Sequence, residues 1–300
     1  MAVMNSSALD GAIDEAVTEV ATAEFFMESM IMPSLYNIRP STGPRETVQS
    51  FGELSDFEVK NEGAEMSTDQ VIQQFQKVFV HITRGKVLEL TEEYLEDDRW
   101  DLAQDFGEQL GAVAAQTYER LAAGVFNDAF AGATYKGEDA LSLCNAAHLN
   151  ADSGNSQSNS GTNALTHAGV KTTRQVMRDI TGYESTTILG IIPNEILVSN
   201  EQEEDGYALL ESTLKPGSQD NDQNMHRGRY TLYVWDFLTD TNNWFMMASR
   251  LRQRYLRWYI RRPLRVLSDA SWSKGVRRIG GSFRTIHGFT NWRWVYGNQP

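Results

Sequence analysis

The sequence predicts an α+β fold, and three features of the 300-residue chain lead to this class. A two-stranded β-hairpin is expected from Thr47 to Glu89, and a long helix from about Asp98 to Phe130. Strand patterns then return near the end of the chain, after an inserted α+β unit. Because the last strands should complete a sheet beside the long helix, we expect the first domain to be discontinuous in sequence.

The composition bounds the class of protein. Hydrophobic residues make up 41% of the chain and aromatic residues 10%, which argues against a disordered chain. Cys144 is the single cysteine, so an intrachain disulfide and a zinc site with two thiolates are excluded. We also expect no secretory signal, because residues 1–20 lack a basic start and an apolar stretch. No apolar run is long enough to span a bilayer, so no membrane association is expected.

The net charge of −13 is unevenly distributed. From Arg250 to Pro300 there are twelve basic residues against one acid, Asp269, which leaves 15 basic and 39 acidic residues before Arg250. A basic end of this kind indicates either nucleic-acid binding or pairing with an acidic protein surface. We favour pairing with protein, because the arginines lie among strand-patterned apolar residues. The acidic majority disfavours close contact with nucleic-acid phosphates, because like charges repel.

The N-terminal segment is predicted to be an acidic amphipathic helix over residues 8–30. Its end is strongly apolar, with Phe25 and Phe26 followed by more methionine and isoleucine. Such an end needs a surface to pack on, in this chain or in another. Pro33 and Pro40 close the segment.

The predicted hairpin alternates clearly over its second strand, residues 75–83. One face carries Phe75, Lys77, Phe79 and His81, and the other carries Gln76, Val78, Val80 and Ile82. The turn-rich segment 60–66 precedes this strand. A long isolated hairpin is marginally stable in water unless it lies on another surface, so the pattern already points to assembly.

The long helix has the clearest pattern in the chain. Asp97 or Asp98 is placed to cap its N-terminus, and the acidic run over residues 92–98 suits the positive end of the helix dipole better than a cation site. Apolar residues follow at helical spacing to Phe130, which corresponds to roughly 45–50 Å of helix.

The remaining elements are shorter. The Ser/Asn/Gly-rich segment 148–166 is expected to be a long loop. After it we expect a helix over His167–Ile180, strand material over Thr187–Val198 interrupted at Pro193, a helix over Gly206–Leu214, strands over Arg229–Phe237 and Trp244–Ala248, a strand with Leu256, Trp258 and Ile260 on one face, and a closing strand with Trp292, Trp294 and Tyr296 on one face.

Catalytic and metal-binding patterns are scarce. The five histidines show no metal-ligand spacing, and no nucleophile elbow or phosphate-binding loop is present. Cys144 and His148 could in principle form a nucleophile pair, but no orienting carboxylate is evident. The loop Asp220–Asn224 lacks the glycine and terminal glutamate of a calcium-binding EF-hand. We therefore expect no enzyme activity, no cofactor and no metal.

Four stretches in this order resemble the major capsid proteins of tailed bacteriophages, which have the Hong Kong 97-type (Johnson) fold. They are Phe57–Asp98, Thr187–Ser199, Arg227–Ala248 and Phe289–Gly297, and among such proteins they look closest to Mu-like major head subunits. The third stretch resembles the return hairpin of that fold. Two departures stand out. Thr290 and Asn291 replace the usual Ser-Asp before the first tryptophan of the closing motif, and residues 136–166 match nothing in the family.

The resemblance implies a division of the chain into named parts. These are an N-terminal arm (1–35), an extended hairpin loop (36–88), a peripheral domain of the long helix and C-terminal strands (89–135 and 250–300), and an axial domain (136–249). It further implies a structural protein that self-assembles into hexamers and pentamers of an icosahedral head around double-stranded DNA. Scaffolding, portal and decoration proteins would be its partners, and the virion, assembled in the host bacterial cytoplasm, its location.

An encapsulin-type bacterial compartment, which shares the fold, is the alternative. Candidate contacts between subunits come from the apolar arm, the hairpin and the basic strand: Phe25, Phe26, Phe57, Lys60, Glu62, Met66, Phe79, Arg257, Arg261 and Arg262.

Overall fold

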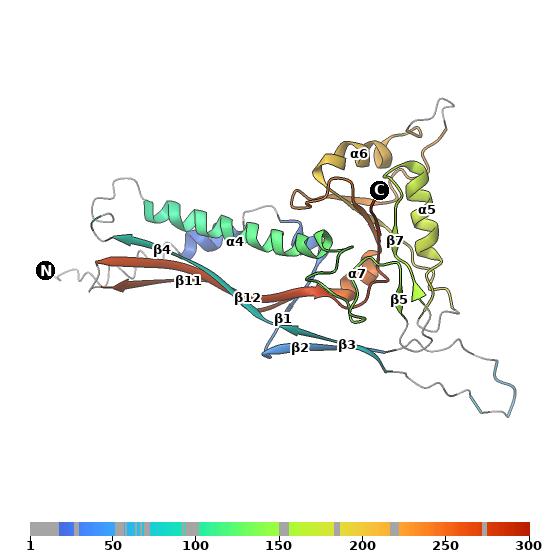
Figure 1. Ribbon diagram of the computed structural model, residues 1–300, viewed down its shortest axis with the longest axis horizontal. Helices are drawn as coiled ribbons and strands as arrows, with labels where there is room; N and C mark the ends of the chain where they lie inside the picture. The colour runs from blue at the N-terminus through green and yellow to red at the C-terminus, as the bar shows by residue number, and fades with distance from the viewer. Residues whose placement is uncertain are drawn as a thin grey trace.

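The computed structural model describes residues 18–26, 30–51, 57, 59–63, 65–66, 68, 73–91, 93, 102–149, 156–182, 187–216, 222–271 and 275–300. The chain forms an elongated limb, in which a long helix lies over a narrow sheet, and a broader region built around a second sheet (Figure 1). A two-stranded hairpin extends from beneath the broader region, away from the limb (Figure 1). The α+β class predicted from the sequence is confirmed.

The limb is a four-stranded sheet covered on one face by α4 (Leu102–Asn127). Its strand order is β1-β11-β12-β4, with β1 (Asn37–Pro40), β11 (Leu256–Ser271), β12 (Val276–Phe289) and β4 (Ile82–Thr91). Tyr118 of α4 packs on Trp258 and Phe283, with ring centroids 5.2 and 4.6 Å away. The strands of the basic region therefore lie beside the long helix, as the sequence predicts.

The broader region surrounds a five-stranded sheet with the order β7-β13-β10-β8-β9. Its strands are β7 (Ser160–Gly161), β13 (Val295–Asn298), β10 (Trp244–Met247), β8 (Glu195–Val198) and β9 (Thr231–Val234). Its helices are α5 (His167–Arg178), α6 (Glu203–Glu211) and α7 (Ser249–Tyr255). Short elements complete the described chain: α2 (Met32–Leu35), β5 (His148–Leu149), β6 (Ser156–Gln157) and the 3₁₀ turn η1 (Asn200–Gln202).

Two expectations about this sheet were wrong. β9 and β10 do not form a hairpin, because β8 lies between them, parallel to β9 and antiparallel to β10. All four residues of β8 are buried, which suits a central strand. The chain also leaves the limb after Phe289, and β13 pairs with β10 rather than completing the limb sheet.

The closing aromatic residues were also misassigned to one face. Trp294 belongs to the core beneath α4, whereas Trp292 and Tyr296 belong to a separate core that includes Val170 and Met177 of α5. The closing segment thus joins the two cores. The aromatic residues alternate in sequence, but Trp292 and Trp294 precede β13, so the two-residue period of a strand does not apply to them.

The longer helices agree with the sequence except at their ends, whereas α7 occupies residues for which no helix was predicted. Residues 18–26 are helical and residue 30 is not, whereas residues 8–17 and 27–29 of the predicted helix lie outside the described residues. The predicted caps Asp97 and Asp98 also lie outside them. Helix α6 begins at Glu203 rather than Gly206, since three acidic residues in its first turn favour the positive end of the helix dipole.

The hairpin pairs β2 (Arg45–Phe51) with β3 (Gln73–Val80), with Thr47 opposite Val78. The predicted alternation is confirmed. Phe79 and His81 are 3% and 6% exposed, whereas the side chains of the opposite face are exposed. β3 continues almost directly into β4, so the hairpin is anchored to the limb through one of its own strands.

His287 makes the limb core sensitive to acid. Its ring stacks on Trp258 at 4.5 Å, and a 2.9 Å hydrogen bond joins its Nε2 to the Tyr135 hydroxyl. Burial, and then the nearby Arg84 charge, lowers the pKa of His287 from 6.5 to about 3. Below about pH 6.5 the His287 side chain binds a proton in the unfolded chain but not in the folded core. The free energy of unfolding therefore falls as the pH drops below about 6.5.

We expect the free energy of unfolding at pH 4.5 to be about 2–3 kcal/mol lower through His287 alone than at pH 7.5. Urea unfolding of the unassembled subunit across this range measures the slope. The His287→Phe variant should show a shallower dependence on pH, whatever its absolute stability. An unchanged slope in that variant would contradict the assignment.

Candidate assembly surfaces

One face of the hairpin is apolar and uncovered. The side chains of Val78, Val80 and Ile82 are 43%, 61% and 47% exposed and follow one another at every second position. A contiguous exposed row of aliphatic side chains is unusual on a monomer and is typical of a protein–protein contact. The sequence showed that two faces alternate, but it could not say which of them packs on the body.

The other face of the hairpin packs on the limb. Phe79 lies against Tyr259 of β11, with ring centroids 5.7 Å apart. It also lies beneath Gly288, where an added Cβ would approach the Phe79 ring to 3.1 Å and where φ is +153°. Phe79 was a candidate contact between subunits, and this is a correction: its aromatic side chain fills a space within its own chain.

Polar contacts fix the hairpin to the loop 136–139. The Lys77 ammonium donates a hydrogen bond to the Lys136 carbonyl at 2.8 Å, and the Ser50 hydroxyl donates to the Glu138 carboxylate. Burial lowers the pKa of Lys77, and the Asp139 charge opposes that shift. Both strands of the hairpin are therefore held at one angle to the body.

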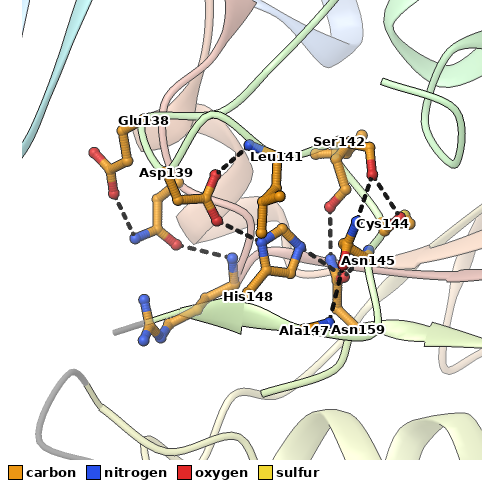
Figure 2. A network of polar contacts seen from close by, with 12 residues as sticks. Glu138, Asp139, Leu141, Ser142, Cys144, Asn145, Ala147, His148 and Asn159 are labelled. Atoms are coloured by element: carbon orange, nitrogen blue, oxygen red, sulfur yellow. Dashed lines mark hydrogen bonds and ion pairs between the residues drawn. The ribbon is translucent and has the colours of Figure 1, made fainter. Parts of the chain in front are cut away.

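The loop itself is held by the network in Figure 2. Glu138 accepts a hydrogen bond from the Asn291 amide at 3.1 Å, and Asp139 contacts His148 Nδ1 at 2.5 Å. His148 Nε2 lies 3.1 Å from Asn159 Oδ1, and its ring stacks on Trp292 at 4.4 Å. The described residues of the segment 136–166 thus include a buried polar network, and its isolated Asp and His gave no signal in sequence.

Cys144 does not act with His148. Its thiol is buried, and burial raises its pKa well above the usual range, so little thiolate forms. The sequence pattern did not reveal an orienting carboxylate, but the structure places Asp139 against His148. No hydrogen bond joins that histidine to the Cys144 thiol. Over the described ranges, no group of three or more potential metal ligands occurs.

A buried carboxylate connects α2, α4 and the broader region. Glu119 of α4 accepts hydrogen bonds from the Met32 backbone at 2.8 Å and from the Trp235 indole at 2.6 Å. Burial raises the pKa of Glu119, although both hydrogen bonds favour the ionised form. The Tyr36 hydroxyl, just after α2, donates to the Ala122 carbonyl at 2.7 Å.

A buried ion pair holds the same segment from the other side. Arg252 of α7 donates to both carboxylate oxygens of Glu195 in β8, each at 2.7 Å. Its remaining nitrogen donates to the Ser34 carbonyl at 3.1 Å and to the Leu35 carbonyl. The carbonyls at the end of α2, which lack helical partners, are thereby satisfied.

The basic strand β11 presents arginines whose charge is not neutralised within the described part of the chain. Arg257 donates to the Tyr259 hydroxyl at 3.0 Å, Arg261 to the Ser41 carbonyl at 3.3 Å, and Arg262 to the Ser282 hydroxyl at 3.1 Å. These acceptors are neutral. By contrast, Arg278 of β12 pairs with Glu89 of β4 at 2.8 Å.

The other predicted contact residues lie in the N-terminal helical segment and in the loop of the hairpin. Phe26 is 73% exposed, whereas Phe25 is partly buried against Tyr118 at 5.2 Å. The exposed members of the hairpin loop are Phe57, Lys60, Glu62 and Met66. The structure does not bring the arm, the loop and the basic strand together in one site.

No helix among the described residues is long and apolar enough to cross a membrane.

The model of a phage capsid protein family matches residues 76–298, which is most of the chain. The fold is similar to that of the capsid of cyanophage P-SCSP1u, with a TM-score of 0.58, 11% identity, and coverage of 89% of this chain and 87% of that one. It is also similar to the capsid of an empty GTA particle, with a TM-score of 0.56, 12% identity, and coverage of 88% and 87%.

A virus-like particle from Pyrococcus furiosus is similar at a TM-score of 0.54 and 11% identity, over 95% of this chain and 98% of that one. A search of curated proteins finds no match. Proteins of this kind are structural components of viral shells, and their place is the capsid. The family match over residues 76–298, on a chain with this fold, shows that the protein belongs to the phage capsid protein family.

Proposed function

We propose that this protein is the major capsid subunit of a tailed phage and that its copies form hexamers and pentamers of an icosahedral head around double-stranded DNA. The observation that carries the proposal is the uncovered aliphatic face of the hairpin, Val78, Val80 and Ile82. A lone subunit leaves this face in water, and a neighbouring copy would bury it. The basic strand with neutral partners supports the same proposal, because an acidic neighbour would complement it.

The finer parts of the proposal follow the resemblance to the tailed-phage fold. The exposed residues Phe26, Phe57 and Met66, with Arg257, Arg261 and Arg262, remain proposed contacts. Residues 1–35 would be an arm, β2 and β3 the extended loop, the limb a peripheral domain, and the broader region an axial domain that includes β13. We further propose a Mu-like head subunit without enzyme activity, assembled in the host cytoplasm with scaffolding, portal and decoration proteins.

Replacing Val80 with aspartate is the direct test. We expect particle yield to fall at least about tenfold, because a carboxylate buried at a contact without a partner costs several kcal/mol. The subunit should remain folded, since Val80 is 61% exposed. Electron microscopy and sedimentation, on subunits expressed alone and with a scaffold, measure the yield.

The matched control is Val176→Asp on α5, where the valine is 38% exposed and belongs to the broader region and not to the hairpin. It should leave the yield of particles within about twofold. If the unmodified chain stays a well-behaved monomer under every assembly condition, the proposal is wrong.

An encapsulin-type compartment is the second candidate, because the Pyrococcus furiosus particle has the same fold. The contents of purified particles discriminate between the two. Packaged double-stranded DNA supports a phage head, whereas an enclosed enzyme without nucleic acid supports a compartment.

A further inference from the structure

A cavity of about 470 Å³ lies between the loop 189–192, helix α7 and the segment 291–293. Its size falls within the range of about 300–1,000 Å³ that is usual for ligand pockets. It lies where the broader region joins the limb, because α7 leads directly into β11 (Figure 1). Asn291, which lines the cavity, also donates a hydrogen bond to Glu138, the residue that holds Ser50 of the hairpin.

One wall of the cavity is aliphatic and incompletely covered. The stretch Thr187–Val198 has the composition of a buried strand, yet β8 begins only at Glu195. The chain turns at Gly190, where φ is +57°, and Ile192, which lines the cavity, is 72% exposed. An aliphatic side chain of this kind is typically buried, so a single subunit lacks the partner that covers it.

The other wall is basic. Arg250 and Arg254 lie four residues apart on α7, both are exposed, and both line the cavity. Arg252, between them, turns inward to Glu195, so the two faces of α7 have different roles. Arg293 adds a third guanidinium, stacked over Trp292 at 4.7 Å, and none of the described residues that line the cavity carries a carboxylate.

We propose that this cavity docks a short acidic segment of a separate protein. An aliphatic or aromatic side chain of that segment enters between Ile192 and Leu251, and its carboxylates pair with Arg250 and Arg254. Arginine at such a position binds carboxylates through two parallel hydrogen bonds, which gives the site its preference for acidic peptides.

The acidic surface of a second copy is a poorer fit. Helix α6 carries Glu203, Glu204 and Asp205 in its first turn, but it lies at the opposite end of the broader region from α7 (Figure 1). In a closed ring of identical copies, α6 lies at the same distance from the symmetry axis in every copy. It therefore faces the end of a neighbouring copy that carries α6, and not the end that carries α7. The site therefore extends the shell function to recruitment of another component.

A binding measurement on the unassembled chain tests the proposal without requiring that shells form. The probe is a fluorescein-labelled peptide of repeating Glu-Asp-Leu, followed by fluorescence polarisation. We expect saturable binding that the double variant Arg250→Gln/Arg254→Gln weakens at least about tenfold, and that Ile192→Ser weakens several-fold. The matched control Arg227→Gln/Arg229→Gln, two exposed arginines outside the cavity, should change affinity by less than about twofold.

Several outcomes would overturn the proposal. These are an absence of saturable binding, equal weakening by the control pair, and equal binding of a Glu-Asp-Ser peptide. A fourth concerns assembly: if Arg250→Gln/Arg254→Gln prevents particle formation by the chain alone, the face is a contact between copies and no separate partner is needed. Normal particles that have lost peptide binding support the proposal.

Discussion

Replacing Arg252 with methionine is expected to lower the free energy of unfolding by about 3–5 kcal/mol. The guanidinium holds both oxygens of Glu195, and the carboxylate is left buried and unpaired when it is removed. The carbonyls of Ser34 and Leu35 lose their donor at the same time. Urea unfolding of the unassembled subunit measures the change.

The double variant Arg252→Met/Glu195→Met separates the cost of an orphaned charge from the value of the pair. Because both charges are then absent, we expect it to recover at least half of the lost stability. Arg250→Met on the exposed face of α7 is the matched control and should change stability by less than about 0.5 kcal/mol. A single Arg252 variant as stable as this control would show that the buried pair does not hold α2.

Arg252 also illustrates what the sequence could not reveal. Among the eleven arginines after residue 249, it has no distinguishing neighbour in sequence. Its role depends on Glu195, 57 residues away, and on carbonyls more than 200 residues away. Pairings of that kind are set by tertiary structure alone, so the basic region could be described in sequence only as a whole.

Local periodicity predicted the elements whose environment is uniform along their length. The hairpin strand and α4 each keep one face toward the body, so alternation or helical spacing identified them. Strand order was not predictable in the same way. β8 enters between β9 and β10 through pairings that leave no local signature, and the misassigned hairpin follows from that.

The candidate contacts between subunits also divide into those that depend on local sequence and those that depend on tertiary packing. Exposure of Phe57 and Met66 in a turn-rich loop agrees with a polar, Gly-containing sequence around them. Phe79 was misjudged because its place depends on Gly288, whose missing side chain leaves room for the ring. The row Val78, Val80 and Ile82 on the opposite face is the better candidate for a contact between subunits. It is identified by the packing of Phe79, which shows which face of the strand lies on the body.

Replacing Glu119 with alanine is expected to lower the free energy of unfolding by about 3–5 kcal/mol. Two buried donors, the Met32 amide and the Trp235 indole, lose the carboxylate that accepts their hydrogen bonds, and each unsatisfied donor costs about 1–3 kcal/mol. A small cavity in the middle of α4 adds to this loss. Thermal and urea unfolding of the unassembled subunit measure it, with Glu108→Ala on the exposed side of α4 as the matched control.

The dependence on pH distinguishes the role of the carboxylate from simple packing. Because the folded pKa of Glu119 is raised, its burial favours the protonated form, so its own contribution to stability increases as the pH falls toward that pKa. The difference in stability between the unmodified subunit and Glu119→Ala should therefore be larger at pH 5 than at pH 8. A difference that instead shrinks at low pH would mean that the two hydrogen bonds outweigh burial, and that the junction holds α2 through an ionised carboxylate.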